Sequence, residues 1–299
     1  MNKPQRAGIP LIAGLSEIAG RYDVVLSDIW GVVHNGRESF AAATHALARF
    51  RRQGGVVILI TNAPRPAAPI RAQLEELRVP SEAYDGLVTS GDVTMALIAA
   101  RRSAPVHHIG PPRDLSLLDG VAGLSGVAPP PLRPLDQADY VLCTGLFDDR
   151  VETPADYDAT LDAMLARRLP MVCANPDLVV QRGDQLIYCA GALAERYEQK
   201  GGSAIYAGKP YPPIYAEAVS AANAARGQST DDSRILAIGD AMRTDVAGAA
   251  RRGIDVLFVT GGIHREDLHR DGALEAAALE QFSARHGLWP TAAIGDLVW

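Results

Sequence analysis

The sequence predicts an α/β protein whose core is a doubly wound parallel sheet, with a second, smaller α/β domain inserted into it. Runs of about five β-forming residues alternate with alanine-rich helical segments, which is the pattern of such a sheet. Several of these runs are apolar throughout, as in strands buried on both faces. The 299 residues also exceed the usual size of a single domain. Two domains, or one domain with a large insertion, are therefore expected.

The first predicted strand ends at Asp28. Residues 24–26 are Val-Val-Leu, and Gly31 and Gly36 allow the chain to turn sharply just beyond the strand. In open α/β sheets, ligands bind outside the carboxyl ends of the strands, so an acidic residue placed there is a functional candidate. The structural alternative for Asp28 is an Asx turn or the cap of a following helix.

The elements around this strand follow the same alternation. Residues 9–20 are predicted as a short helical lead-in. After Asp28, the expected order is a helix at 41–52 that ends at Gly54 and Gly55, a strand at 56–60 followed by Thr61 and Asn62, and a helix at 66–77 whose entry is marked by prolines.

The sequence pattern changes near residue 85, and we predict that the inserted domain begins there. The proline-rich stretch at 128–134 is expected to be a stiff connector. The other segments are predicted as a helix that runs to residue 100, strands at 106–109, 140–143, 171–174 and 185–188, and helices at 154–168 and 192–200.

The first pattern is expected to resume near Ile205. The predicted elements are a helix at 213–225, a strand at 235–238 followed by Gly239 and Asp240, a helix at 244–252, a strand at 255–259 and a terminal helical segment. The predicted core domain is therefore discontinuous, with residues 1–84 and 204–299, and the predicted cap domain comprises residues 85–203.

Composition narrows the class of protein. Hydrophobic residues make up 47% and charged residues 21% of the chain, as in globular proteins. The net charge of −6 argues against a nucleic-acid or anionic-membrane partner. No run reaches the roughly 18 apolar residues of a membrane span, the N-terminus lacks the apolar core of a signal peptide, and the three cysteines form no Cys-x-x-Cys pair. We expect a soluble cytoplasmic protein, with a homo-oligomer left open.

Polar side chains follow the strands of the predicted core sheet. They are Asp28, Thr61 with Asn62, Lys209, and Asp240 with Asp245. Taken singly, each could be a helix cap or a solvated loop residue. Together they suit the attack of a carboxylate on a phosphate ester. Two anions 4 Å apart repel by roughly 1 kcal/mol in water and about 4 at an effective dielectric of 20. A divalent cation, a lysine and hydroxyl or backbone donors offset that repulsion.

Four ordered motifs resemble those of the haloacid dehalogenase superfamily: Asp28-x-x-Gly-Val, Thr61-Asn62-Ala63, Gly208-Lys209-Pro210 and Gly239-Asp240-Ala-Met-Arg-Thr244-Asp245. The branch that the chain resembles is subclass IIA, the p-nitrophenyl-phosphatase-like group, in which an α/β cap lies between the second and third motifs. Three cap segments are also similar to that branch: Thr89-Ser-Gly-Asp92, Cys173-Ala-Asn-Pro-Asp177 and Gly191-Ala-Leu-Ala-Glu-Arg-Tyr197. The resemblance covers almost the whole chain.

The resemblance implies a Mg²⁺-dependent phosphatase that acts on a small phosphorylated metabolite. Asp28 is then the nucleophile that forms an aspartyl-phosphate, and Lys209 neutralises the nucleophile and the phosphate. Thr61 and the backbone of Asn62 hold the phosphoryl oxygens. The implied metal ligands are Asp28, the backbone carbonyl of Trp30, Asp240, and Asp245 directly or through water.

Trp30 departs from the phosphatase pattern. Phosphatases of this superfamily carry a second Asp at this position, which protonates the leaving group and activates the hydrolytic water. Such catalysis typically contributes about 10²- to 10⁴-fold. Three outcomes stay open. The enzyme uses leaving groups that need little protonation, or a nearby group such as His34. It runs a metal-independent dehalogenase reaction, against which the intact pair Asp240 and Asp245 argues. Or it is a catalytically weakened phosphometabolite-binding or regulatory protein.

Four residues are candidates for lining the substrate pocket: Trp30, His34, Asn175 and Asp177. Trp30 is expected to form a wall of the pocket, and His34 is expected to pack in its loop rather than act as an acid. Asn175 and Asp177 belong to the predicted cap, which is expected to close over the site and exclude water.

Overall fold

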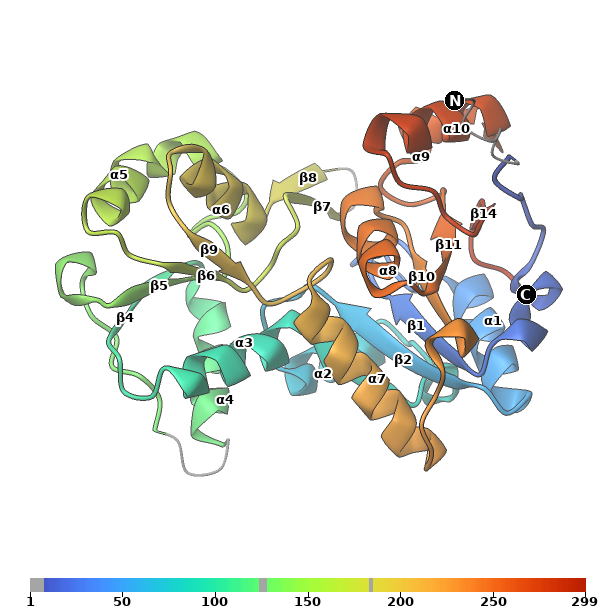
Figure 1. The fold of residues 1–299 in the computed structure, drawn as a ribbon, viewed down its shortest axis with the longest axis horizontal. Helices are drawn as coiled ribbons and strands as arrows, with labels where there is room; N and C mark the ends of the chain where they lie inside the picture. Colours follow the sequence, from blue (N-terminus) through green and yellow to red (C-terminus); the bar gives the residue numbers. More distant parts are fainter. Residues whose placement is uncertain (1–7, 124–127, 183–184) are drawn as a thin grey trace, which may run out of the picture. The chain divides into compact units, whose positions relative to one another are not determined.

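The main sheet has six strands, in the order β14-β11-β10-β1-β2-β3 (Figure 1). The structure is a computed structural model that describes residues 8–123, 128–182 and 185–299. The strands are β1 (Val24–Asp28), β2 (Val56–Thr61), β3 (Gly86–Thr89), β10 (Ile235–Gly239), β11 (Asp255–Val259) and β14 (Ala292–Ile294). β10 pairs in parallel with both β1 and β11, and β11 pairs in parallel with β14. The parallel α/β core predicted from the sequence is confirmed.

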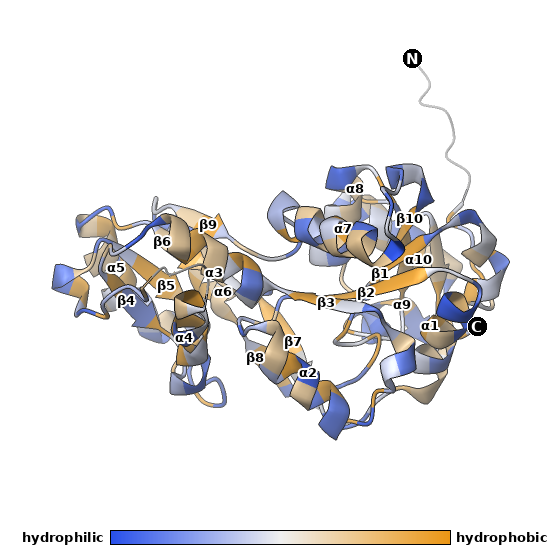
Figure 2. Cartoon of the chain, turned by 90° about the horizontal axis from the view of Figure 1, so that it is seen from below, coloured by the Kyte–Doolittle hydropathy of each residue, from blue (hydrophilic) through white to orange (hydrophobic). Residues whose placement is uncertain are grey.

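Apolar side chains bury these strands. Every residue of β1, β2 and β10 is buried, and Figure 2 shows β1 and β2 as predominantly hydrophobic. Burial on both faces explains why these runs lack the polar alternation of a half-exposed strand. The helices in this part of the chain are α1 (Ala41–Arg52), α8 (Ala247–Arg252), α9 (Arg265–Leu268) and α10 (Ala276–His286).

The inserted segment forms a second parallel sheet, in the order β4-β5-β6-β9. Its strands are β4 (Val106–Ile109), β5 (Tyr140–Cys143), β6 (Met171–Cys173) and β9 (Ala204–Tyr206). The helices against it are α3 (Ser90–Ala100), α4 (Ser116–Ala122), α5 (Asp158–Ala166) and α6 (Ala190–Gln199). Val141 and Cys143 of β5 pack with residues of α5 and α6. Tyr140 and Leu142 pack with residues of α3 and α4, so helices cover both faces of this sheet (Figure 1).

Two small sheets, two further helices and several short turns complete the fold. β7 (Val179–Arg182) pairs antiparallel with β8 (Gln185–Tyr188), and β12 (His269–Arg270) pairs antiparallel with β13 (Ala273–Leu274). The remaining elements are α2 (Ala67–Glu76), α7 (Pro212–Arg226), 3₁₀ turns at Leu15–Glu17, Ala19–Arg21, Ser81–Ala83, Pro112–Leu115, Leu135–Gln137, Pro154–Tyr157 and Asp232–Arg234, and a π-helical turn at Met242–Val246. Within the described ranges, no helix combines the length and the apolar character needed to cross a bilayer.

The described residues divide into two compact units. The first takes those up to Leu59, Val79–Gly86 and Ala222–Trp299, and the second takes Ile60–Arg78 and Leu87–Ala221. The second unit therefore holds the whole four-stranded sheet, together with α2 and most of α7. The domain boundaries predicted at 84/85 and 203/204 stay a prediction.

Most predicted elements are present, and several differ in their ends. The helix at 41–52 and the strands at 106–109, 140–143, 185–188 and 255–259 occur with the predicted bounds. The helical lead-in at 9–20 consists of two 3₁₀ turns. The helix expected at 244–252 begins as the π-helical turn, and the one expected at 154–168 begins as a 3₁₀ turn.

Strand β9 is the main correction to the predicted layout. The expected return to the first pattern at Ile205 does not hold for residues 204–206, because β9 pairs with β6 and forms an edge of the second sheet. β9 has three residues, none of them buried, so it lacks the apolar run that identifies a core strand. The sequence prediction also lacks β3, β7 and β14.

Candidate active site

Three buried carboxylates meet in the first unit. Asp28, Asp240 and Asp245 are 9%, 6% and 3% exposed, and one carboxylate oxygen of each lies within 4.8 Å of the others. We call them the carboxylate cluster. Two oxygens on opposite sides of a Mg²⁺ ion are about 4 Å apart, which is twice the metal–oxygen distance. The cluster is therefore close to the size that a divalent cation requires, and it consists of the oxygen ligands that Mg²⁺ prefers.

Two adjacent strands and one turn position the carboxylate cluster. Asp28 is the last residue of β1, and Asp240 directly follows β10. The parallel register of these two strands brings their carboxyl ends to the same level. Asp245 comes from the π-helical turn that follows β10. A π-helical turn inside a helix is rare and frequently marks a functional site.

Backbone amides orient all three carboxylates. The contacts run from the Ile29 amide to Asp28 Oδ1 (2.7 Å), from the Ile263 amide to Asp240 Oδ2 (2.8 Å) and from the Ala241 amide to Asp245 Oδ2 (3.2 Å). An ionised carboxylate has about four lone-pair sites, and each of these amides occupies one of them. The amides therefore fix the direction of the carboxylates without using their full capacity as acceptors.

Glycines make room for the carboxylate cluster. A Cβ on Gly31, whose φ is +74°, would lie 1.8 Å from Asp240 Oδ2, and one on Gly262 would lie 2.0 Å from the same atom. A Cβ on Gly239 would lie 2.1 Å from Asp245 Cγ. Real Cβ atoms do not approach other atoms this closely, so a side chain at any of the three positions would displace a carboxylate.

Trp30 and His34 pack on each other in the turn after β1. Their ring centroids are 4.9 Å apart in an edge-to-face arrangement. A Cβ on Gly36, whose φ is +82°, would lie 2.5 Å from the indole ring. His34 is 1% exposed, its Nδ1 accepts a hydrogen bond from the Gly36 amide (3.1 Å), and burial lowers its pKa to about 4. A neutral imidazole of this kind does not protonate a leaving group near pH 7, so these observations favour the packing role.

Three further predicted site residues lie in the second unit. Thr61 ends β2, and its Oγ1 accepts a hydrogen bond from the Ala63 amide (3.2 Å). Asn62 and Lys209 are each 3% exposed. The Lys209 amide donates to Asn62 Oδ1 (2.7 Å), and Asn62 Nδ2 donates to the Lys209 carbonyl (3.2 Å). These two hydrogen bonds place the segments of the second and third predicted motifs side by side.

The two pocket candidates of the inserted segment join the same group of contacts. Asp177 Oδ1 accepts a hydrogen bond from Asn62 Nδ2 (2.9 Å). The side chain of Asn175, which is 8% exposed, accepts one from the Asp177 amide through Oδ1 (3.0 Å). Asn175 therefore orders its own loop, and Asp177 contacts the second motif.

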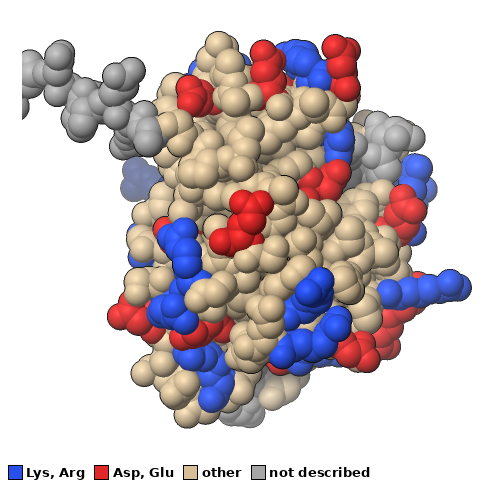
Figure 3. Space-filling model, turned by 90° about the vertical axis from the view of Figure 1, so that its right-hand side faces the viewer, with Lys and Arg blue, Asp and Glu red and all other residues tan. Residues whose placement is uncertain are grey.

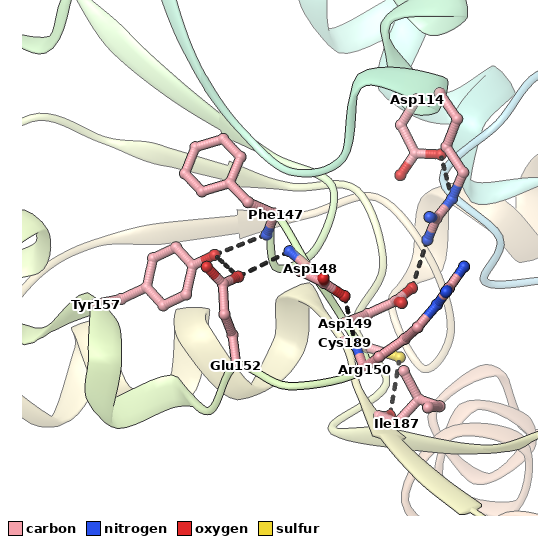
Figure 4. A network of polar contacts seen from close by, with 10 residues as sticks. Asp114, Phe147, Asp148, Asp149, Arg150, Glu152, Tyr157, Ile187 and Cys189 are labelled. Atoms are coloured by element: carbon pink, nitrogen blue, oxygen red, sulfur yellow. Dashed lines mark hydrogen bonds and ion pairs between the residues drawn. The ribbon is translucent and has the colours of Figure 1, made fainter.

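The structure contains a polar network that was not predicted from the sequence. Its residues follow strands β4 and β5 of the second sheet along the chain. Asp114 is 4% exposed, and burial raises its pKa to about 6 although the charges of Arg113 and Arg65 oppose that change. Arg113 forms an ion pair with Asp149. Figure 4 labels Asp114 and Asp149. Asp114 and Asp149 follow β4 and β5 along the chain. The strand-end rule that selects Asp28 would also have pointed to them, had it been applied to the inserted sheet.

The loop after β5 is braced by a tyrosine. The Tyr157 hydroxyl donates to Glu152 Oε2 (2.7 Å) and accepts a hydrogen bond from the Phe147 amide (2.7 Å), as Figure 4 shows. The Asp148 amide donates to the same Glu152 oxygen (2.8 Å). These contacts hold the loop in one conformation while the Phe147 ring stays 51% exposed.

Comparisons with known families agree with the order of the motifs. Residues 25–122 match the family described as haloacid dehalogenase-like hydrolase, and residues 206–284 match a second family of HAD-like hydrolases. The chain is also 46% identical to a solved hydrolase of the haloacid dehalogenase-like family from Brucella suis 1330. That alignment covers 96% of this chain and 100% of the other, with a TM-score of 0.84.

Two curated relatives are more distant. D-glycerol 3-phosphate phosphatase from Mycobacterium tuberculosis is 29% identical in an alignment of 263 positions, which covers 84% of this chain and 66% of that protein. The match thus spans just under two thirds of the mycobacterial protein. Chronophin from Bos taurus is 26% identical in an alignment of 298 positions, which covers 93% of this chain and 92% of that protein. The two family matches and the full-length likeness at 46% identity lead to one conclusion: the chain belongs to the haloacid dehalogenase-like hydrolase family.

Proposed function

We propose that this protein is a Mg²⁺-dependent phosphatase of the p-nitrophenyl-phosphatase-like branch, which hydrolyses a small phosphorylated metabolite through an aspartyl-phosphate on Asp28. The observation that carries the proposal is the carboxylate cluster, in which three oxygens from Asp28, Asp240 and Asp245 lie within 4.8 Å of one another. The name of one curated relative, D-glycerol 3-phosphate phosphatase, supports the substrate class.

The proposed reaction has two steps. A carboxylate oxygen of Asp28 forms a bond to phosphorus while the bond from phosphorus to the ester oxygen breaks, and the leaving oxygen takes its proton from solvent. Water then attacks phosphorus, the bond between Asp28 and phosphorus breaks, and inorganic phosphate leaves. Asp28, Asp240 and Asp245 would hold Mg²⁺, whose positive charge would reduce the repulsion between the carboxylates and the phosphate ester.

The other site residues take the roles that the family motifs imply. Asp240, Asp245 and the Trp30 carbonyl complete the metal ligands. Thr61 and the backbone of Asn62 hold the phosphoryl oxygens. Lys209, which is 3% exposed, supplies the second positive charge. An ammonium group placed away from water acts more strongly on an anion than one at the surface, because the local dielectric is lower.

The test is hydrolysis of p-nitrophenyl phosphate by the purified protein with Mg²⁺. We expect turnover that disappears when EDTA removes the metal and that falls at least 10³-fold in Asp28→Asn, because an amide cannot form the phosphoenzyme. Asp139→Asn, which changes an exposed carboxylate of the second unit, is the matched control and should keep full activity. Turnover that survives in Asp28→Asn, or release of halide from a haloacid without metal, would contradict the proposal.

Trp30 favours one second candidate, a phosphometabolite-binding protein with weakened catalysis. The side chain at this position has no ionisable group, and it packs against His34 and Gly36. Tight binding of a phosphate ester with Mg²⁺, combined with no detectable turnover even of the activated aryl ester, would support this candidate over the enzyme.

We further propose that the protein works in the cytoplasm, as a monomer or a homo-oligomer. Its cysteines, Cys143, Cys173 and Cys189, are all buried free thiols, and such thiols persist in a reducing compartment.

A further inference from the structure

The side-chain amide of Asn62 joins two other segments of the second unit. It accepts a hydrogen bond from the Lys209 amide (2.7 Å) and donates one to the Lys209 carbonyl (3.2 Å). Its second N–H donates to Asp177 Oδ1 (2.9 Å). We call these three contacts the Asn62 bridge. We propose that Asn62 and Asp177 are positioning residues, which hold the Lys209 backbone in place and link it to the inserted loop at 175–177.

The chemistry of the bridge requires an amide at position 62. Both backbone polar groups of Lys209 are bonded by one side chain, much as a neighbouring strand would bond them. Rotating the amide by 180° would turn its oxygen toward the Lys209 carbonyl and the Asp177 carboxylate, both of which are acceptors, so only one orientation satisfies all three contacts. A carboxylate at position 62 would meet the same two acceptors with a negative charge.

The loop that carries Asp177 is itself fixed. Its amide donates to Asn175 Oδ1 (3.0 Å), and the loop directly follows β6. A Cβ on Gly191, in the first turn of α6, would lie 2.2 Å from the Pro176 carbonyl oxygen and 2.5 Å from that of Asp177. The helix and the loop backbone are thus in direct contact. The position of Asp177 therefore follows the framework of β6 and α6.

The segment before Lys209 packs as closely on the bridge. A Cβ on Gly208 would lie 2.3 Å from Asn62 Oδ1, 2.8 Å from Pro176 Cδ and 2.9 Å from Ser90 Oγ. With both sides of the bridge fixed in this way, the loss of a hydrogen bond made by the Asn62 side chain cannot be absorbed by sliding of the backbone. It must instead displace Lys209.

In the second motif, the backbone and the Asn62 side chain therefore have different roles. The backbone of this segment is the part proposed to hold the phosphoryl group, whereas the Asn62 side chain is used entirely by Lys209 and Asp177. The kinetic consequence of the bridge rests on the proposed function, because it assumes that Lys209 acts on the phosphate. The structural consequence, that the Lys209 backbone is held by Asn62, does not depend on any activity.

The first measurement is spectroscopic and needs no substrate. The chain contains three lysines, Lys3, Lys200 and Lys209, so protein labelled with ¹⁵N-lysine gives three backbone amide signals. Lys200→Arg and Lys3→Arg assign the Lys209 signal by elimination. We expect this signal to shift, and its hydrogen exchange to accelerate at least about tenfold, in Asn62→Asp and Asn62→Ala, because its acceptor is lost or moved. An unchanged Lys209 signal in both variants would overturn the proposal.

The second measurement is kinetic, and it uses a double variant in which the residues at positions 62 and 177 are swapped. Asn62→Asp should lower kcat/KM for p-nitrophenyl phosphate about 100-fold, mainly through kcat. Asp177→Asn alone should cost less than about threefold, since an amide oxygen still accepts the hydrogen bond from Asn62. The variant N62D/D177N recovers a donor and acceptor pair between the two positions and should regain about tenfold over Asn62→Asp. A double variant no better than Asn62→Asp would overturn the link between the loop and Lys209.

Ser90→Ala is the matched control. Ser90 Oγ is buried beside Gly208 and has no hydrogen-bond partner among the described residues, so its removal trims the same region without breaking the bridge. It should leave the Lys209 signal and kcat unchanged. If the wild-type protein hydrolyses no p-nitrophenyl phosphate at all, the proposed function fails. The hydrogen-exchange rate of the Lys209 amide then still tests whether the Asn62 bridge holds the Lys209 backbone. A displaced Lys209 signal with unchanged kcat would instead refute the positioning role alone.

Discussion

The side chain at position 30 determines how the proposed phosphatase treats its leaving group. We predict that Trp30→Asp raises kcat on an alkyl phosphate at least about 10²-fold over Trp30→Asn, because only the carboxyl group supplies a proton donor. Both variants lose the contacts of the indole with His34 and Gly36, so Trp30→Asn controls for the lost packing. Steady-state kinetics on glycerol 3-phosphate measure the difference. Equal rates for the two variants would show that the missing acid does not limit turnover.

Asp114 is a second residue whose environment has a measurable consequence. Burial raises the pKa of its carboxyl from 3.8 to about 6, and the charges of Arg113, Arg65 and Asp149 modify that effect. The folded state therefore binds the proton more tightly than the unfolded chain does. The resulting stabilisation is complete below the unfolded pKa of 3.8, and it is lost as the pH rises through about 6.

The corresponding variant is Asp114→Asn, which stays uncharged at every pH. As the pH rises from 4 to 7, we expect the free energy of unfolding of the wild type to fall by roughly 2 kcal/mol relative to that of the variant. Urea denaturation at several pH values measures it. His34, whose pKa burial lowers to about 4, titrates in both proteins and cancels in the difference. Parallel curves for the two proteins would contradict the raised pKa.

Residues differ in how far their place follows from the sequence. Asp28 and Asp240 could be predicted as neighbours, because each follows an apolar run and parallel strands end at one edge of a sheet. The contact of Asn62 with Asp177 could not, because it depends on how a loop more than a hundred positions away is held. The burial of Asp114 likewise depends on packing that no local pattern records.

At the scale of elements, the carboxylate cluster is surrounded by the carboxyl ends of β1 and β10 and by the loop after β11. Gly262, three residues after β11, lies where a Cβ would be 2.0 Å from Asp240 Oδ2. We predict that Gly262→Ala weakens Mg²⁺ binding at least about tenfold, because Asp240 must turn away from the cluster. Isothermal titration with Mg²⁺ alone measures the affinity.

Gly295→Ala is the control for this prediction. Gly295 directly follows β14 in the same sheet, and a Cβ there meets no atom within 4 Å. This variant should bind Mg²⁺ as the wild type does. If Gly262→Ala also kept the wild-type affinity, the carboxylate cluster would not be the metal site.

Longer strands are predicted correctly from the sequence where all of their residues are buried. The prediction fails for the short strands β9 and β14. β1, β2 and β10 are buried at every residue, so their apolar runs are continuous and visible in the sequence. β9 and β14 have three residues each and take their strand conformation from a partner strand. The π-helical turn at Met242–Val246 leaves no such trace either, because its residues are compatible with an ordinary helix.

At the scale of the whole molecule, the described residues divide into two units. The first holds most of the six-stranded sheet, and the second holds the whole four-stranded sheet. Alternation of strands and helices predicts both sheets. It does not predict which unit takes α2, because that depends on contacts and not on order along the chain. On the face shown in Figure 3, basic and acidic side chains are interspersed and neither sign dominates. Such a surface suits the proposed small-metabolite substrate better than a polyanionic partner.

The carboxylate cluster has a consequence for the biosynthesis of the protein. Its first member precedes the second by 212 positions (240 − 28 = 212), with the whole inserted segment between them. At a synthesis rate of about 5–20 residues per second, Asp28 waits roughly 10–40 seconds on the ribosome for its partners. A nascent chain that has not reached Asp245 therefore lacks part of the carboxylate cluster. Binding of the proposed Mg²⁺ ion would have to wait until the whole inserted segment has been translated.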